Sequence, residues 1–184
     1  MAFVSSDTQI YRTKIGKDIV VENDSLYEKR LNMIMENFEE PETIHKFIIK
    51  KIIPELPEKK FFMDIGAGKG DYTLPISEYF KHICIVEPNE IFCADLAKAL
   101  LLSGKVVAVY KGIWEDFEET TGQKCNLIMC TNVLYYVLGK KKLIGAIQKM
   151  ISCLASGGKI VISLASENSP TALPLFKLFS GHNI

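Results

Sequence analysis

The sequence predicts an α/β fold in which an open, mainly parallel sheet carries helices on both faces. Short, nearly continuous apolar runs alternate with segments of helical periodicity from about residue 58 onward. Parallel strands have such runs because the helices that connect them bury both faces of the sheet. The first run also leads directly into a glycine-rich turn, and folds of this class hold ligands at such turns.

The residues before this alternation divide into two segments. Residues 1–24 have no strong period, and we expect them to form a loosely docked arm. A capping residue and an apolar stripe predict a helix over residues 26–37, and Pro41 favours the start of a second helix that runs to about residue 53. We therefore expect an N-terminal arm, a helical cap over residues 25–57 and a main domain over residues 58–184.

The main domain is predicted to contain five strands, each a short apolar run bounded by turn residues. They are expected at Phe61–Ile65, His82–Glu87, Val106–Tyr110, Asn126–Thr131 and Lys159–Ala165. Helices are expected at Tyr72–Tyr79, from Pro88-Asn89 through Leu102, at Lys141–Leu154 and at Leu173–Ser180, with a short helix or loop over residues 114–120. In the helix at Lys141–Leu154, the residues expected to face the sheet are Leu143, Ile144, Ile147, Met150 and Ile151.

Composition argues against several classes of function. The 22 basic and 22 acidic side chains cancel, whereas a nucleic-acid binder normally carries a basic surplus. There is no apolar stretch of about 18 residues and no secretory signal, so we expect neither a membrane span nor export. The five cysteines include no Cys-x-x-Cys pair, which indicates reduced thiols in a cytoplasmic protein without a metal site.

The glycine-rich turn has the pattern Asp64-x-Gly66-x-Gly68-x-Gly70. Its glycine spacing differs from the Gly-x-Gly-x-x-Gly fingerprint of dinucleotide-binding folds. A carboxylate two residues before the first glycine would repel a pyrophosphate, but it suits a ligand that carries an amine. The alternative is that Asp64 only caps the loop.

Glu87 ends the second predicted strand and is followed by Pro88. A carboxylate in that position can accept both hydroxyl hydrogens of a ribose. Its alternative is a solvated acid at the end of a strand. Together with the turn, the acid predicts a site for a nucleoside-containing ligand at the carboxyl edge of a Rossmann-like sheet.

Four short motifs together resemble the class I S-adenosylmethionine (SAM) methyltransferases. They are the glycine turn at 64–70, Ile85-Val86-Glu87-Pro88, Asn132-Val133-Leu134-Tyr135-Tyr136-Val137 and Ser156-Gly157-Gly158-Lys159. The resemblance covers about residues 40–165. Within that superfamily, the Val-Glu-Pro and Leu-Tyr-Tyr-Val sequences are locally similar to histamine N-methyltransferase.

The resemblance implies a cofactor, a reaction and a set of contacts. SAM would donate a methyl group to a small molecule, with an amine nitrogen favoured, and would leave as S-adenosylhomocysteine (SAH). The expected cofactor-binding residues are Asp64, Gly66, Ala67, Gly68, Gly70, Glu87, Pro88, Ile113, Trp114 and Thr131. The expected substrate-binding residues are Glu40, Asn132, Tyr135 and Tyr136. No catalytic residue is assigned.

Several of these assignments have alternatives. Many methyltransferases have an Asp that accepts the adenine amino group where this chain has Ile113, so backbone groups would replace that contact. Trp114 either covers the adenine ring or packs against the sheet, since aromatic residues mostly fill cores. Glu40 matches an amine-binding Glu of the histamine enzymes but also fits a solvated helix end. Asn132 stands where those enzymes have a longer Gln.

The chain departs from this family in length. The family fold has seven strands, so a sheet that stops after the fifth strand is expected to be truncated. Its last strand would be an edge with apolar surface, and we expect a second copy of the chain or the terminal segment to cover it. A non-catalytic SAM-binding or scaffold protein, and then an NAD-dependent oxidoreductase, are the alternatives to the enzyme.

Overall fold

The computed structural model describes residues 8–12, 18–22, 40–119, 122–137 and 140–164. The chain divides into two compact units. The first contains residues 1–39 and 166–184, and the second contains residues 40–165. Each unit is described by itself.

The first unit contains a two-stranded antiparallel sheet. Strand β1 (Thr8–Arg12) pairs with β2 (Asp18–Glu22). The sequence analysis expected a loosely docked arm here, because polar residues flank the short apolar stretches within residues 8–12 and 18–22. The expected helix over residues 26–37 and the one at Leu173–Ser180 lie outside the described residues.

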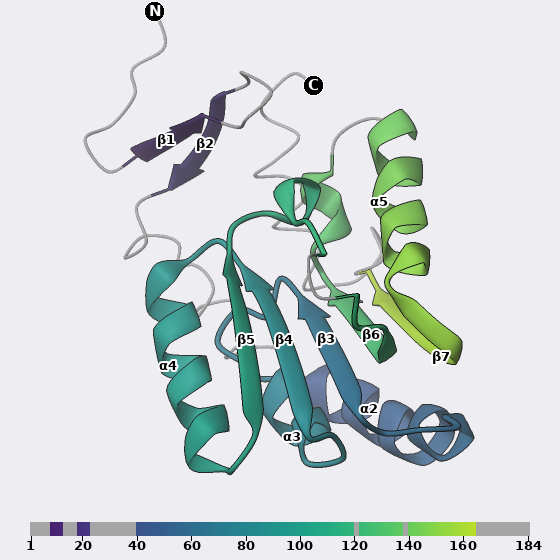
Figure 1. Ribbon diagram of the computed structural model, residues 1–184. Helices are drawn as coiled ribbons and strands as arrows, with labels where there is room; N and C mark the ends of the chain where they lie inside the picture. The colour runs from purple at the N-terminus through teal and green to yellow at the C-terminus, as the bar shows by residue number, and fades with distance from the viewer. Residues whose placement is uncertain (1–7, 13–17, 23–39, 120–121, 138–139, 165–184) are drawn as a thin grey trace, which may run out of the picture. The chain divides into compact units, whose positions relative to one another are not determined.

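The second unit is built on a five-stranded parallel sheet with the order β5-β4-β3-β6-β7 (Figure 1). Its strands are β3 (Phe61–Ile65), β4 (His82–Glu87), β5 (Val106–Lys111), β6 (Cys125–Thr131) and β7 (Leu154–Ser163). This arrangement confirms the predicted fold class. The chain leaves the middle strand β3 toward β4 and β5 on one side and returns to β6 and β7 on the other. The carboxyl ends of β3, β4 and β6 therefore meet at a topological switch point, where open sheets bind ligands.

The helices of this unit are α2 (Glu40–Phe47), α3 (Thr73–Ser77), α4 (Glu90–Leu102) and α5 (Lys140–Ser152). Helix α2 continues without a break into a π-helical turn, η1 (Ile48–Ile52), and a 3₁₀ turn, η2 (Ile53–Glu55). Two further 3₁₀ turns, η3 (Trp114–Asp116) and η4 (Leu134–Tyr136), follow β5 and β6. The helical stretch over residues 40–55 belongs to the same compact unit as the sheet.

Two apolar clusters cover the two faces of the sheet. On one face, Phe62 and Met129 pack with Ile48, Ile76 and Leu96 from the helical segments η1, α3 and α4. On the other face, the cluster contains Met63 and Ile128 of the sheet with residues of η3, η4 and α5. Alternate residues of each strand therefore point to opposite clusters, as the pleat requires.

Helix α5 buries a different stripe from the one expected. Ala146 and Met150 are buried, with Leu143 packed beside them, but Ile144 and Ile151 are 46% and 57% exposed. Residues 143, 146 and 150 recur at helical spacing and form one stripe, and the two isoleucines lie beside it on the helix surface. The prediction that these two isoleucines face the sheet was wrong.

Strand β7 is the edge of the described sheet next to β6, as expected. It begins at Leu154, five residues earlier than predicted, because the Ser156-Gly157-Gly158 stretch lies within it. The register against β6 is irregular there, between Cys125 and Leu127. Ile162 is 39% exposed on this strand.

All five cysteines are free, and four of them are buried while Cys84 is half-buried. Burial raises the pKa of Cys93 to about 11 and that of Cys130 to about 12. Within the described ranges, no cluster of metal-binding side chains is present and no helix has the length and apolar character needed to cross a membrane.

Candidate cofactor and substrate site

The glycine turn follows β3 directly and is fixed to both neighbouring strands. Gly66, Gly68 and Gly70 have φ of 72°, 54° and 89°, a region that favours glycine. The Gly66 N–H donates to the Val86 carbonyl at 2.7 Å. A Cβ on Gly66 would lie 2.1 Å from Cγ2 of Val133, so this glycine lets the turn pack against the segment after β6. Gly68 instead faces open space.

Glu87 is tied to this turn by its own carboxylate. The Gly68 N–H donates to Oε2 and the Asn89 N–H donates to Oε1, each at 2.9 Å. The side chain is 2% exposed, which rules out the alternative of a solvated acid. The turn after β3 and the end of β4 therefore form one preformed unit.

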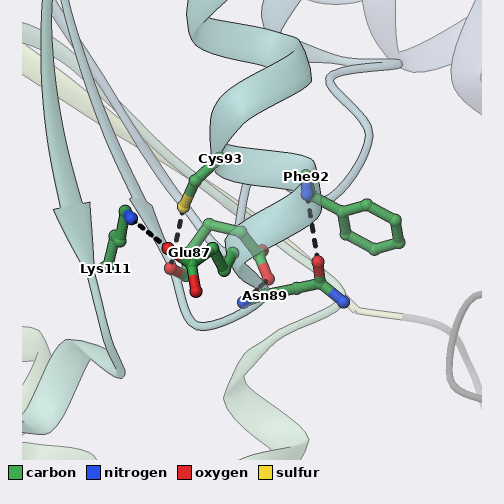
Figure 2. A network of polar contacts seen from close by, with 6 residues as sticks. Glu87, Asn89, Phe92, Cys93 and Lys111 are labelled. Carbon is green, nitrogen blue, oxygen red and sulfur yellow. Dashed lines mark hydrogen bonds and ion pairs between the residues drawn. The ribbon is translucent and has the colours of Figure 1, made fainter. Parts of the chain in front are cut away.

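The start of α4 supports the same carboxylate, as Figure 2 shows. Asn89 is the N-cap of the helix, and its Oδ1 accepts a hydrogen bond from the Phe92 N–H at 3.0 Å. The Cys93 thiol donates to the backbone carbonyl of Glu87 at 3.2 Å. The sequence indicated the start of this helix but not its contact with Glu87.

Asp64 lies beneath the turn and is 2% exposed. Its Oδ2 accepts a hydrogen bond from the Thr73 hydroxyl at 2.6 Å. Burial raises the pKa of Asp64 to about 7, the Thr73 hydrogen bond opposes that shift, and the charge of Glu87 adds to it. A positive group placed here would favour the ionised carboxylate. The Asp64–Thr73 hydrogen bond also matches the alternative in which the carboxylate caps its own loop.

Strand register brings a third polar residue to this end of the sheet. Ile65 pairs with both Val86 and Cys130, so the residues that follow them, Gly66, Glu87 and Thr131, stand level at the carboxyl edge. Asp64, Glu87 and Thr131 each follow a residue of the α3 and α4 face by two positions, and they therefore point to that face.

The end of β6 differs from the other two strand ends in its polar contacts. Thr131 is 7% exposed, and its hydroxyl has no hydrogen-bond partner among the described residues. Asn132 has a φ of 56°, the only positive value outside glycine in the described chain, and its N–H donates to Ser163 at 2.9 Å. Tyr136 is 56% exposed on η4. The side chains of Glu40 and Tyr135 lie outside the described part of the structure.

In the segment after β5, Trp114 packs against the sheet, which is the second of the two roles considered for it. Trp114 is 3% exposed, its indole N–H donates to the Ala146 carbonyl at 3.1 Å, and its ring stacks on Phe117 at 5.2 Å. The indole therefore fills the core and does not line the carboxyl edge. Ile113 is half-buried at the start of η3, with its backbone beside that edge.

A groove of about 470 Å³ lies elsewhere, at the opposite end of the sheet, where β6 begins. Lys124, Lys149 and Ser152 border it, and it contains none of the predicted site residues. It is therefore not part of the candidate site.

Comparison with known families agrees with this geometry. The family described as "Methyltransferase domain" matches residues 35–179. The chain belongs to this methyltransferase domain family. No curated protein sequence matches it significantly.

Solved structures similar to this methyltransferase domain share its fold. An S-adenosylmethionine-dependent methyltransferase from Clostridium acetobutylicum is 15% identical with a TM-score of 0.66, over 77% of this chain and 57% of its own. The SAM-bound amino pentose methyltransferase CalS10 from Micromonospora echinaspora is 19% identical with a TM-score of 0.60, over 77% and 56%. The sugar N-methyltransferase KedS8 from a Streptoalloteichus species is 22% identical with a TM-score of 0.57, over 92% and 61%.

The methyltransferase domain described here thus spans less than two thirds of the length of these proteins. An rRNA methylase from Streptococcus thermophilus also has a similar fold, with a TM-score of 0.51. The fold therefore does not discriminate between acceptors, and any argument about substrate depends on the residues of the site.

Sequence reasoning assigned no role in the site to three residues that hold it together. Thr73 donates to Asp64, Asn89 donates to Glu87, and Val133 fills the space that a side chain on Gly66 would occupy. Only Asn89 had a recognisable signal, since an Asn after Pro88 and before an apolar helix is a typical N-cap. The other two contacts join segments that only the folded topology brings together.

Proposed function

We propose that this domain transfers a methyl group from SAM to the amine nitrogen of a small molecule. The observation that carries the proposal is the joint fixation of the glycine turn and Glu87 through the hydrogen bond from Gly68 to Oε2. This arrangement joins a backbone surface without side chains to a carboxylate suited to a ribose.

The described residues fit such a cofactor. Glu87 ends β4 beside the glycine turn, and a carboxylate in that position can accept the hydroxyl hydrogens of a ribose. Gly68 would let the cofactor approach the backbone closely, because no neighbour lies within 4 Å of a Cβ built there. Asp64, buried below the turn, would favour the amino group of the methionine part.

The bound cofactor would supply a methyl group that is activated by a sulfonium. The protein's part is then to orient the acceptor and exclude water. We assign the acceptor end to the edge of β6, at Asn132 and Tyr136, with Thr131 on the cofactor side near the transferred methyl group, because the carboxyl end of β6 lies next to that of β3. Glu40, at the start of α2, and Tyr135 remain further candidates for binding the substrate.

An amine acceptor is favoured by two considerations. The Leu134-Tyr135-Tyr136-Val137 sequence is similar to that of histamine N-methyltransferase, and two proteins of similar fold are an amino pentose and a sugar N-methyltransferase. The balanced charge of the chain argues against a nucleic-acid acceptor.

We also propose that a second copy of the chain covers the β7 edge, which size measurement at several concentrations would test.

The first experiment measures thermal stability with SAM, SAH and NAD. A ligand at a hundredfold excess over its Kd stabilises the folded state by about 2.7 kcal/mol. We expect shifts with SAM and SAH that are lost in Glu87→Ala. Glu90→Ala is the matched control, because Glu90 is an exposed acid nearby that pairs with Lys111.

Three results would contradict or redirect the proposal. A shift with NAD alone would overturn it in favour of an oxidoreductase. SAH binding without methylation of any amine in a panel of sugars and biogenic amines would leave a SAM-binding scaffold. A shift that Glu87→Ala retains would place the cofactor elsewhere.

A further inference from the structure

The segment after β5 forms one wall of the proposed cofactor site. In the register of the sheet, Glu87 at the end of β4 stands opposite Lys111 at the end of β5. The Gly112 N–H donates to the Glu87 backbone carbonyl at 3.1 Å. The glycine turn lies on the other side of β4. A nucleoside with its ribose at Glu87 and its amino acid part at the glycine turn therefore directs its base toward residues 112–114.

This wall has little internal structure of its own. Its 3₁₀ turn η3 has three residues and is closed by two hydrogen bonds, from Asp116 to Ile113 and from Phe117 to Trp114, both 3.2 Å long. Such short turns need outside partners for their remaining carbonyl groups.

The Tyr110 hydroxyl donates to the Asp116 carbonyl at 2.8 Å, and Lys149 of α5 supplies partners for three other carbonyls. Its Nζ donates to the carbonyl oxygens of Trp114 at 2.8 Å, Glu115 at 2.9 Å and Phe117 at 2.8 Å. These three acceptors match the three donors of an ammonium group. The same Nζ lies 4.9 Å from the centre of the Trp114 ring, within the range of a cation–π interaction.

The hydrogen bonds that Lys149 donates all reach one segment, residues 114–117. Burial lowers its pKa, and the carboxylates of Glu115, Asp116 and Glu118 oppose that shift, as does the Cys153 thiol. The indole N–H of Trp114 is itself bound to Ala146, one turn earlier on α5. Helix α5 therefore binds η3 at two positions, Ala146 and Lys149. The position of α5 itself is set by its packing in the core.

We infer that Lys149 is a positioning residue that fixes the base-binding wall of the cofactor site by holding three backbone carbonyls of the η3 segment against α5. It does not touch the cofactor. It sets the position of the Ile113 backbone. Ile113 has no acidic side chain that could accept a hydrogen bond from the base. The inference rests on the proposed function.

The test compares Lys149→Met, Lys149→Arg and Lys124→Met. Methionine keeps an apolar stem but no donors, and arginine keeps several donors. Lys124 is the matched control, because it borders the same groove and donates to one α5 carbonyl, that of Ser152 at 2.7 Å. Calorimetry would give Kd for SAH and for S-inosylhomocysteine, in which hypoxanthine replaces adenine. Hydrogen exchange would follow the Asp116 and Phe117 amides.

In Lys149→Met we expect Kd for SAH to rise about three- to tenfold, the range for mutations that act on a ligand from outside its site. Its preference for SAH over the inosine analogue should shrink, and the Asp116 and Phe117 amides should exchange faster. Lys149→Arg should recover most of the preference, and Lys124→Met should behave as the wild type.

An unchanged preference in a folded Lys149→Met protein, or equal acceleration of exchange over the whole domain, would overturn the inference and leave the proposed function standing. Wild-type protein that binds neither compound would overturn both.

Discussion

The two sides of the proposed site are held in different ways. At β3 and β4, the polar groups find their partners within the chain, since backbone N–H groups of Gly68 and Asn89 bind the Glu87 carboxylate. At β6, the Thr131 hydroxyl is buried without a partner in the described structure, and Asn132 has a left-handed backbone. Native proteins leave few buried polar groups unpaired, and such groups concentrate where ligands bind. One side is thus preformed, and we expect a bound ligand to complete the other.

The largest expected effect comes from the contact that joins the two sides. Gly66→Ala would place a Cβ 2.1 Å from Val133, so the turn or the β6 segment must move. We expect the free energy of unfolding to fall by about 2–4 kcal/mol, from left-handed strain and overpacking together. Urea denaturation would measure it.

Gly104→Ala separates the two causes, because Gly104 has a φ of 73° but nothing within 4 Å of its added Cβ. It should lose only the strain part, about 1–2 kcal/mol. Adding Val133→Ala to Gly66→Ala should recover part of the packing loss. Equal losses in the two glycine variants would show that the sides are not in firm contact.

Substitution of Asp64 tests whether the preformed side of the site binds a positively charged group. Its folded-state pKa of about 7 lies above the usual value for Asp, so it contributes stability below pH 4 that is lost as pH rises through 7. We expect the free energy of unfolding to decline over that interval more in the wild type than in Asp64→Asn. Conversely, SAH affinity should increase with pH by up to about tenfold per unit below pH 7, and not in Asp64→Asn.

Thr73→Val removes the hydrogen bond that lowers the Asp64 pKa, so it should move both transitions to higher pH. If the wild type and Asp64→Asn show the same pH profile for SAH, Asp64 only supports the loop.

The smallest effect contrasts two threonines. Thr131→Val removes a buried hydroxyl without a described partner, so we expect a gain of about 1 kcal/mol in unfolding free energy and slower methyl transfer. Thr73→Val, whose hydroxyl is paired with Asp64, should lose about 1 kcal/mol. Chemical denaturation and methyl-transfer assays would measure both. A loss in both variants would mean that Thr131 has a structural role like that of Thr73.

Features could be predicted from the sequence where their signals lie within one short stretch of the chain. The five strands, the glycine turn and the start of α4 could be predicted because their signals are local: apolar runs, glycine spacing and an N-cap. The strands of the first unit were missed because polar residues flank the short apolar stretches within residues 8–12 and 18–22.

The remaining features depend on contacts between distant segments. Neither the pairing of Asp64 with Thr73 nor the burial of Trp114 against Ala146 can be read from spacing along the chain. The isoleucines of α5 show the same limit, because several apolar stripes fit one helix and the packing of the sheet selects among them.

The protonation of the buried thiols has a consequence for a domain that would hold an alkylating cofactor. The Cys93 thiol donates to the carbonyl of Glu87, and Cys130 pairs across the sheet with Ile65, which follows Asp64. With pKa values of about 11 and about 12, their thiolate fractions at pH 7 are on the order of 10⁻⁴ and 10⁻⁵. Thiolates are the strongest nucleophiles that a protein chain carries, and here the fold keeps them in their unreactive form. If the domain binds SAM as proposed, this protonation would limit methylation of Cys93 and Cys130 by the cofactor.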